Sequence, residues 1–131
     1  MGLDNGICVK RTDKTANIPE LLRFEDDWIR KYQTDYEVCY WRKCWNVRHM
    51  IMDVVTGGFS DSYRIFLTAD DVSRIAEALG SFTEHNWEDE GGSIWEFCEY
   101  KEILGDQIAN LGVLKRLMQE HELAVYFYDS Y

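Results

Sequence analysis

The sequence predicts an α+β fold, in which a small, mainly antiparallel sheet carries helices packed on one face. Short segments rich in β-branched and aromatic residues occur near both ends and in the middle of the chain, and they favour strands. Longer amphipathic segments with helical spacing lie between them. With 131 residues, of which 46% are apolar, the chain is long enough to bury a core, and we expect one domain over residues 1–131.

The first half of the chain contains two predicted strands and one predicted helix. A strand is expected at 6–9, a short helical turn opened by the only proline at 19–24, a strand at 36–40 and a helix at 42–55. Residues 26–32 have too few apolar positions for an assignment. Gly57-Gly58 ends the helix, because glycine readily adopts the left-handed conformation that follows a helix.

The second half is predicted to alternate in the same way. A strand at 63–67 precedes Thr68 and Asp71, which form a capping box for a helix that stops near Gly80. Residues 83–93 are polar and contain glycine, so we expect an exposed loop. A long helix follows at 94–120, with Gly105 and Gly112 as possible sites of close packing or bending. The apolar run at 123–128 predicts a strand in the middle of the sheet.

Several functional classes lack their usual signatures in this chain. The N-terminus has neither the basic region nor the apolar segment of a secretory signal, and no apolar run reaches 18 residues, so a cytosolic protein without a membrane segment is expected. The four cysteines are then expected to be free thiols. Phosphate-binding loops, zinc-ligand spacings and hydrolase motifs are not found. We therefore predict a binding protein that is not an enzyme and holds no metal or cofactor.

The net charge of −10 is unevenly distributed along the chain. Residues 1–56 contain nine Lys/Arg and nine Asp/Glu, whereas residues 57–131 contain five and fifteen, so the second half carries the whole excess of −10. A field of this sign disfavours direct binding to nucleic acid and favours a basic partner surface, such as the groove of a nucleic-acid-binding protein.

A set of carboxylates and two tryptophans provides a candidate protein-binding surface. If the loop and the long helix bring these residues together, they could imitate the regular charge of a nucleic-acid backbone, with the tryptophans as anchors. The alternative is an ordinary solvated surface. The set comprises Trp87, Glu88, Asp89, Glu90, Trp95, Glu96, Glu99, Glu102 and Asp106.

A second cluster combines aromatic rings and fixed cations within nine residues. Guanidinium groups donate paired hydrogen bonds to phosphate or carboxylate, and aromatic side chains stack on bases, so the cluster could bind a nucleotide. In the expected helix, Trp41 and Trp45 are neighbours. The alternative is that the tryptophans belong to the core and the cations pair with internal carboxylates. The cluster comprises Tyr40, Trp41, Arg42, Lys43, Trp45 and Arg48.

Three segments resemble a group of small proteins encoded by bacteriophages and prophages. They are the opening Gly2-Leu3-Asp4 with Gly6-Ile7, the central Glu37-Val38-x-Tyr40-Trp41-Arg42-Lys43 with Trp45 and Arg48, and the closing Phe127-Tyr128-Asp129-Ser130-Tyr131. This resemblance implies a phage or prophage origin and action in the cytosol of a bacterial host. Small acidic phage proteins without catalytic motifs often resemble inhibitors of host defence nucleases.

These observations lead to one leading hypothesis and one alternative. The leading hypothesis is a phage accessory protein of the anti-CRISPR kind, which inhibits a host defence protein or nucleoprotein complex by docking its acidic surface on a basic one. The alternative is a small binding protein that sequesters a nucleotide signalling ligand through the aromatic and basic cluster.

Overall fold

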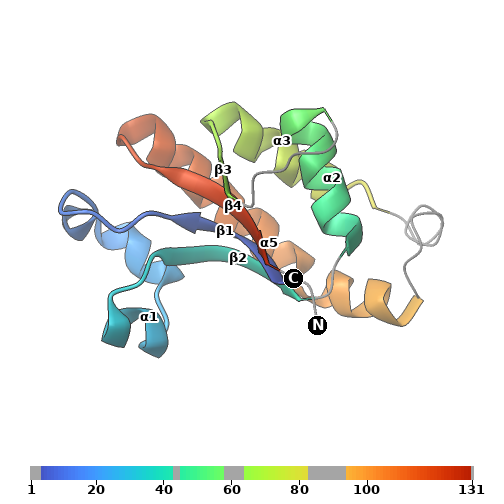
Figure 1. Ribbon diagram of the computed structural model, residues 1–131, viewed down its shortest axis with the longest axis horizontal. Helices are drawn as coiled ribbons and strands as arrows, with labels where there is room; N and C mark the ends of the chain where they lie inside the picture. Colours follow the sequence, from blue (N-terminus) through green and yellow to red (C-terminus); the bar gives the residue numbers. More distant parts are fainter. Residues whose placement is uncertain (1–3, 43–44, 58–63, 83–93, 131) are drawn as a thin grey trace.

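Four strands form one antiparallel sheet in the order β2-β1-β4-β3 (Figure 1). The structure, a computed structural model, describes residues 4–42, 45–57, 64–82 and 94–130. The strands are β1 (Asp4–Val9), β2 (Tyr36–Arg42), β3 (Arg64–Phe66) and β4 (Val125–Ser130). The first and last strands pair at the centre of the sheet, so the predicted central position of the C-terminal strand is confirmed.

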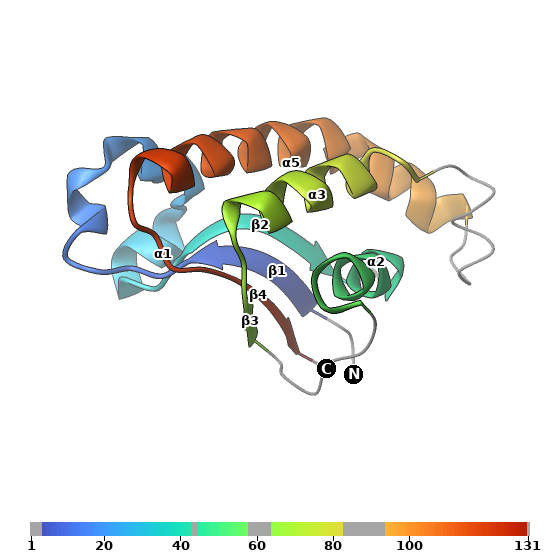
Figure 2. The same ribbon diagram turned by 90° about the horizontal axis from the view of Figure 1, so that it is seen from above.

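Helices cover one face of this sheet, which confirms the predicted α+β fold. The helices are α1 (Asp27–Tyr32), α2 (Trp45–Thr56), α3 (Ala69–Leu79) and α5 (Ile94–Glu120), with two 3₁₀ segments, η1 (Thr15–Asn17) and η2 (Pro19–Phe24), before α1. Figure 2 shows α3 and α5 side by side on that face, with α2 near the chain ends and α1 at the opposite end of the sheet.

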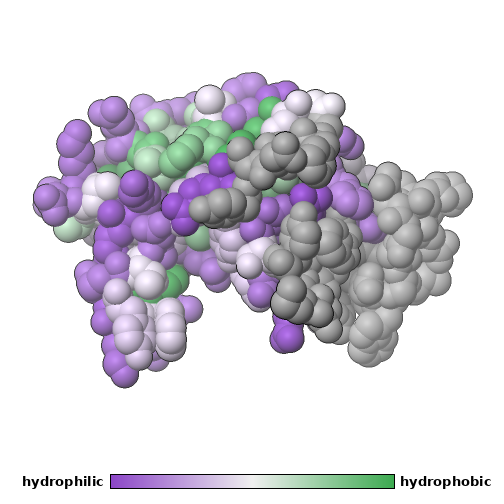
Figure 3. All heavy atoms as spheres, in the orientation of Figure 1, coloured by the Kyte–Doolittle hydropathy of each residue, from purple (hydrophilic) through white to green (hydrophobic). Residues whose placement is uncertain are grey.

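Strand alternation separates the two faces of the sheet. On β4, Val125, Phe127 and Asp129 point to the helices, and the first two belong to the hydrophobic core. Leu111, Leu114 and Leu117 of α5 are fully buried in the same core. Figure 3 shows a band of apolar residues over α3 and the C-terminal half of α5, and hydrophilic residues over most of the remaining coloured surface on this side.

The edge strand β2 is tied to α5 by side-chain hydrogen bonds. Nε2 of Gln107 donates to the carbonyl oxygen of Tyr40 at 3.3 Å, and Nδ2 of Asn110 donates to that of Val38 at 3.2 Å. These contacts use backbone acceptors of an edge strand that would otherwise be open to pairing with another chain.

The capping box that opens α3 is confirmed. The Thr68 hydroxyl accepts from the Asp71 backbone N–H, and the Asp71 carboxylate accepts from that of Thr68. Burial alone would raise the pKa of Asp71, but hydrogen bonds from Thr68 and Arg74 lower it. The helix ends before Gly80, as predicted.

Two local predictions differ from the structure, and one segment without an assignment forms a helix. Arg42 is the last residue of β2, and the helix predicted from that position begins at Trp45, because β2 pairs with β1 from Tyr36 to Arg42, with one bulge at Val38. Residues 27–32, left without an assignment, form α1, which Asp26 caps by accepting the Ile29 backbone N–H at 2.8 Å. An added Cβ at Gly105 or Gly112 would meet no atom within 4 Å, so neither glycine marks a close contact.

Candidate functional site

Two residues of the predicted protein-binding set lie exposed on α5. Glu102 and Asp106 are one helical turn apart, and the buried side chains of Tyr100, Leu111 and Leu114 face the core. The remaining members are not placed: Trp87, Glu88, Asp89 and Glu90 lie outside the described residues, and so do the side chains of Trp95, Glu96 and Glu99.

Glu102 and Asp106 form no ion pair with any described residue. Two carboxylates of the neighbouring helix α3 are paired, because Arg74 lies 3.3 Å from Asp70 and 2.8 Å from Asp71, whereas Glu77 of α3 forms no ion pair with a described residue. Like charges four residues apart on a helix destabilise it by about 0.2–0.5 kcal/mol. The pair on α5 therefore contributes nothing favourable to the stability of its own helix.

Asp129, also from the acidic half of the chain, is not on the surface. Its Oδ2 accepts from Nε of Arg48 at 2.5 Å, and the two side chains are 5% and 8% exposed. Asp129, one of the fifteen acidic residues of the second half, is therefore neutralised in the interior by Arg48. The excess negative charge of that half is carried by the remaining carboxylates.

The strand geometry of β2 divides the aromatic and basic cluster between the two faces of the sheet. Trp41 points to the helices, is 1% exposed and donates from Nε1 to Oε1 of Gln107 at 2.7 Å. Arg48 is buried on the same side. Tyr40 and Arg42 are exposed and point to the opposite face.

The six residues therefore cannot line one pocket, and the core interpretation holds for Trp41. Arg48 fulfils the alternative expectation that a cation of the cluster pairs with an internal carboxylate. Lys43 and the side chain of Trp45 lie outside the described part of the chain.

The face of the sheet opposite the helices is rich in tyrosine, which sequence reasoning missed. The Tyr40 hydroxyl donates to Oδ1 of Asp4 at 2.5 Å, and this hydrogen bond raises the pKa of Tyr40. The Tyr128 ring lies against Gly6, where an added Cβ would be 2.9 Å from its Cε1. Arg64 stacks over the Tyr126 ring at 4.5 Å. The sequence did contain a signal for this face: Tyr126 and Tyr128 alternate along β4, and Tyr128 lies opposite Gly6 of β1.

An unsatisfied amide lies on the helix-facing side, next to the internal ion pair. Asn5 is fully buried, and neither its Nδ2 nor its Oδ1 has a hydrogen-bond partner. The register places it directly between Trp41 of β2 and Asp129 of β4. Such a group costs free energy unless water reaches it.

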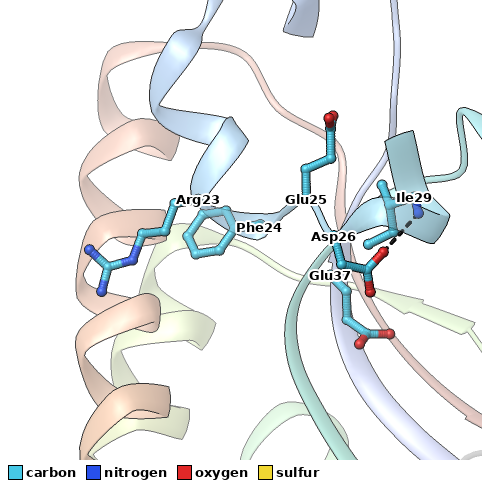
Figure 4. Close-up of a pocket in the computed structure, with 6 residues that line it drawn as sticks. All are labelled: Arg23, Phe24, Glu25, Asp26, Ile29 and Glu37. Atoms are coloured by element: carbon cyan, nitrogen blue, oxygen red, sulfur yellow. Dashed lines mark hydrogen bonds between the residues drawn. The ribbon is translucent and has the colours of Figure 1, made fainter. Parts of the chain in front are cut away.

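A shallow hollow of about 150 Å³ lies between the η2–α1 segment and β2. It is lined by Arg23, Phe24, Glu25, Asp26, Ile29 and Glu37 (Figure 4). Hydrogen bonds from Arg11 and Arg30 lower the pKa of Glu25. Burial, reinforced by the charge of Asp26, raises the pKa of Glu37, which forms no ion pair with a described residue.

The two buried cysteines do not have the environment of a nucleophile. Burial raises the pKa of Cys8 to about 12, and burial likewise raises the pKa of Cys39, so both are protonated at neutral pH. Cys8, Cys39 and Cys98 are free thiols. The described residues contain no group of three or more His, Cys, Asp or Glu side chains placed to hold a metal ion.

Comparison with protein-family models, with curated proteins and with solved structures finds no significant match. Within the described ranges, no helix combines the length and the apolar character needed to cross a membrane.

Proposed function

We propose that this chain is a protein-binding inhibitor of a host defence complex, such as a CRISPR effector, and that it docks the acidic face of α5 on a basic surface of that complex. The observation that carries the proposal is the pair of exposed carboxylates, Glu102 and Asp106, one turn apart and without a cationic partner among the described residues. The resemblance to phage-encoded proteins supports the choice of a host defence target.

The energetics of the pair favour a role outside the fold. Two like charges at this spacing repel, whereas Asp70 and Asp71 of α3 are paired with Arg74. An external cationic surface would relieve the repulsion and gain charge-assisted contacts.

The spacing also suits imitation of a nucleic-acid backbone. Four residues of α-helix advance about 6 Å along the axis, close to two phosphate steps of one B-DNA strand, about 6.8 Å. A groove lined by lysine and arginine to hold phosphates could therefore accept carboxylates placed in this way.

The test compares two double variants that change the net charge equally. Glu102→Lys with Asp106→Lys alters the proposed surface, and Asp53→Lys with Glu77→Lys alters exposed carboxylates on α2 and α3. Each is expressed in cells that carry a CRISPR effector, and the plating efficiency of a targeted phage is measured. The unaltered protein and the control pair are expected to restore plating, and the α5 pair is expected to fail.

The thermal midpoint of each variant separates loss of binding from loss of folding, because exposed substitutions of this kind change stability by no more than about 0.5 kcal/mol. Full protection by the α5 pair would contradict the proposal. Failure of the unaltered protein against a panel of effectors would contradict the choice of target. The aromatic and basic cluster gives the nucleotide alternative no support, since Trp41 and Arg48 are interior residues.

A further inference from the structure

The short helix α1 presents an exposed aromatic pair. Trp28 is 64% exposed and Tyr32 is 51% exposed, and their rings contact each other with 4.3 Å between centroids and a tilt of 48°. In Figure 3 a pale projection at the lower left coincides with the position of α1 in Figure 1. Tryptophan and tyrosine are the side chains that most often dominate binding at protein interfaces, and both side chains are more than half exposed here.

The hollow beside α1 adds charge to this aromatic surface. Asp26, the N-cap of α1, and Ile29 on its buried side both line the hollow, so the aromatic pair and the hollow share one helix. Figure 4 shows the carboxylates of Asp26 and Glu37 directed to the same side, whereas Arg23 and Glu25 point away from them.

The two groups that point away already have partners. Nε of Arg23 donates to Oδ1 of Asn110 at 2.8 Å, and Glu25 is paired with Arg11 at 3.1 Å and with Arg30 at 3.0 Å. Asp26 accepts one backbone hydrogen bond, and Glu37 has no ion pair with a described residue. The carboxylates of the hollow without an ion pair are therefore those of Asp26 and Glu37, while Arg23 keeps its positive charge because its partner Asn110 is neutral.

We propose that α1 and the hollow form a second docking surface, on which a protein partner places an arginine side chain between Asp26 and Glu37 and packs against Trp28 and Tyr32. The surface belongs to the N-terminal half of the chain and includes no residue of α5, so the inference goes beyond the proposed function.

Arginine fits this surface better than other cations. Its planar guanidinium group donates to two carboxylates at once, is weakly hydrated and stacks on aromatic faces. Lys31 already lies over the Tyr32 ring at 5.3 Å, while no described cation lies over Trp28. A metal ion is less suitable, because the hollow brings only two free carboxylates together.

Desolvation of Glu37 supplies a driving force for this contact. The carboxylate is half-buried, and burial disfavours its charged form, as the direction of its pKa shift indicates. A fixed cation in the hollow would compensate that cost and bring the pKa of Glu37 back toward the ordinary range.

The test uses ¹H–¹⁵N spectra of the full chain titrated with N-acetyl-arginine methylamide at about 10 mM, which detects millimolar dissociation constants. The matched probe is the citrulline analogue, which has nearly the same shape and no charge. Arginine is expected to shift the resonances of Asp26, Trp28, Tyr32 and Glu37, and citrulline is expected to leave them unchanged.

Variants assign the effect to single groups. Glu37→Gln is expected to weaken arginine binding about tenfold, because it removes a hydrogen bond to a charged acceptor. Asp26→Asn is expected to weaken binding while keeping the N-cap, since asparagine caps helices as well as aspartate. Asp13→Asn, in an exposed loop, is the control and should change nothing.

Two results would overturn the inference: no difference between the arginine and citrulline probes, or shifts that persist unchanged in Glu37→Gln. The α5 double variant should bind the arginine probe normally. Failure of this surface is therefore distinguishable from failure of the proposed function.

Discussion

Arg48 of α2 and Asp129 of β4, 81 residues apart in the sequence, form an internal ion pair with 2.5 Å between Nε and Oδ2. The pair anchors the beginning of α2 to the last strand, next to the buried amide of Asn5. Because both side chains are buried and paired with each other, Arg48 is not available as a surface cation of the aromatic and basic cluster. For the same reason, Asp129 does not add to the negative surface charge of the second half of the chain.

Breaking this pair on one side should strongly destabilise the protein. Arg48→Met leaves Asp129 as an uncompensated buried charge, with an expected loss of about 3–5 kcal/mol in the free energy of unfolding measured by urea titration. Arg74→Ala is the control, because it removes a half-exposed cation and should cost no more than about 1 kcal/mol. Equal losses for the two variants would show that the interior pair is hydrated.

Gly6 should not tolerate a side chain. An added Cβ would lie 2.6 Å from the backbone carbonyl oxygen of Cys39 and 2.9 Å from Cε1 of Tyr128, so Gly6→Ala should cost about 1–3 kcal/mol. The matched substitution Gly112→Ala on the exposed side of α5 meets no atom within 4 Å and should stabilise the protein by about 1 kcal/mol. Thermal unfolding of the two variants should therefore shift in opposite directions.

Gln107 should be required for the contact between α5 and the edge strand. Gln107→Leu removes the acceptor of the Trp41 indole N–H and the donor to the Tyr40 carbonyl, with an expected cost of about 1–3 kcal/mol. Gln119→Leu, exposed on the same helix, should change stability by less than about 0.5 kcal/mol. A neutral result at Gln107 would mean that water replaces both hydrogen bonds.

Glu37→Gln should stabilise the protein at neutral pH. The folded-state pKa of Glu37 is raised above its ordinary value of 4.5, so the folded protein binds its proton more tightly than the unfolded chain does. The contribution of Glu37 to the free energy of unfolding is therefore greatest below pH 4.5. This contribution is lost as the pH rises through the raised folded-state pKa. The Tm difference between variant and parent should grow over that window, and a difference independent of pH would contradict the assignment.

The sequence predicted the elements whose signals are local. The capping box at Thr68, the long helix at 94–120 and the central C-terminal strand are all confirmed. The predicted start of the helix at Arg42 was wrong, because Trp41 and Arg42 extend β2 by pairing with Asn5 and Asp4 of β1, a contact that is not local in the sequence. The helix α1 was missed because six residues with a single buried side chain carry too weak a periodic signal.

The candidate site was less predictable than the fold. In a helix, Trp41, Trp45 and Arg48 would share one stripe, but in a strand the alternation of side chains separates Trp41 from Tyr40 and Arg42. The pairing of Arg48 with Asp129 depends on tertiary structure and has no signal in the sequence. By contrast, the exposure of Glu102 and Asp106 follows from helical periodicity. For these two residues, the position expected from the sequence is the one that the structure shows.

The most direct test of the acidic docking surface is the affinity of the purified protein for its purified target complex, measured by titration at low and high salt. We predict that Glu102→Lys with Asp106→Lys weakens binding at least tenfold at low salt, that Asp53→Lys with Glu77→Lys binds like the parent, and that salt weakens parental binding. Equal affinities for the parent and both double variants, unchanged by salt, would contradict the account.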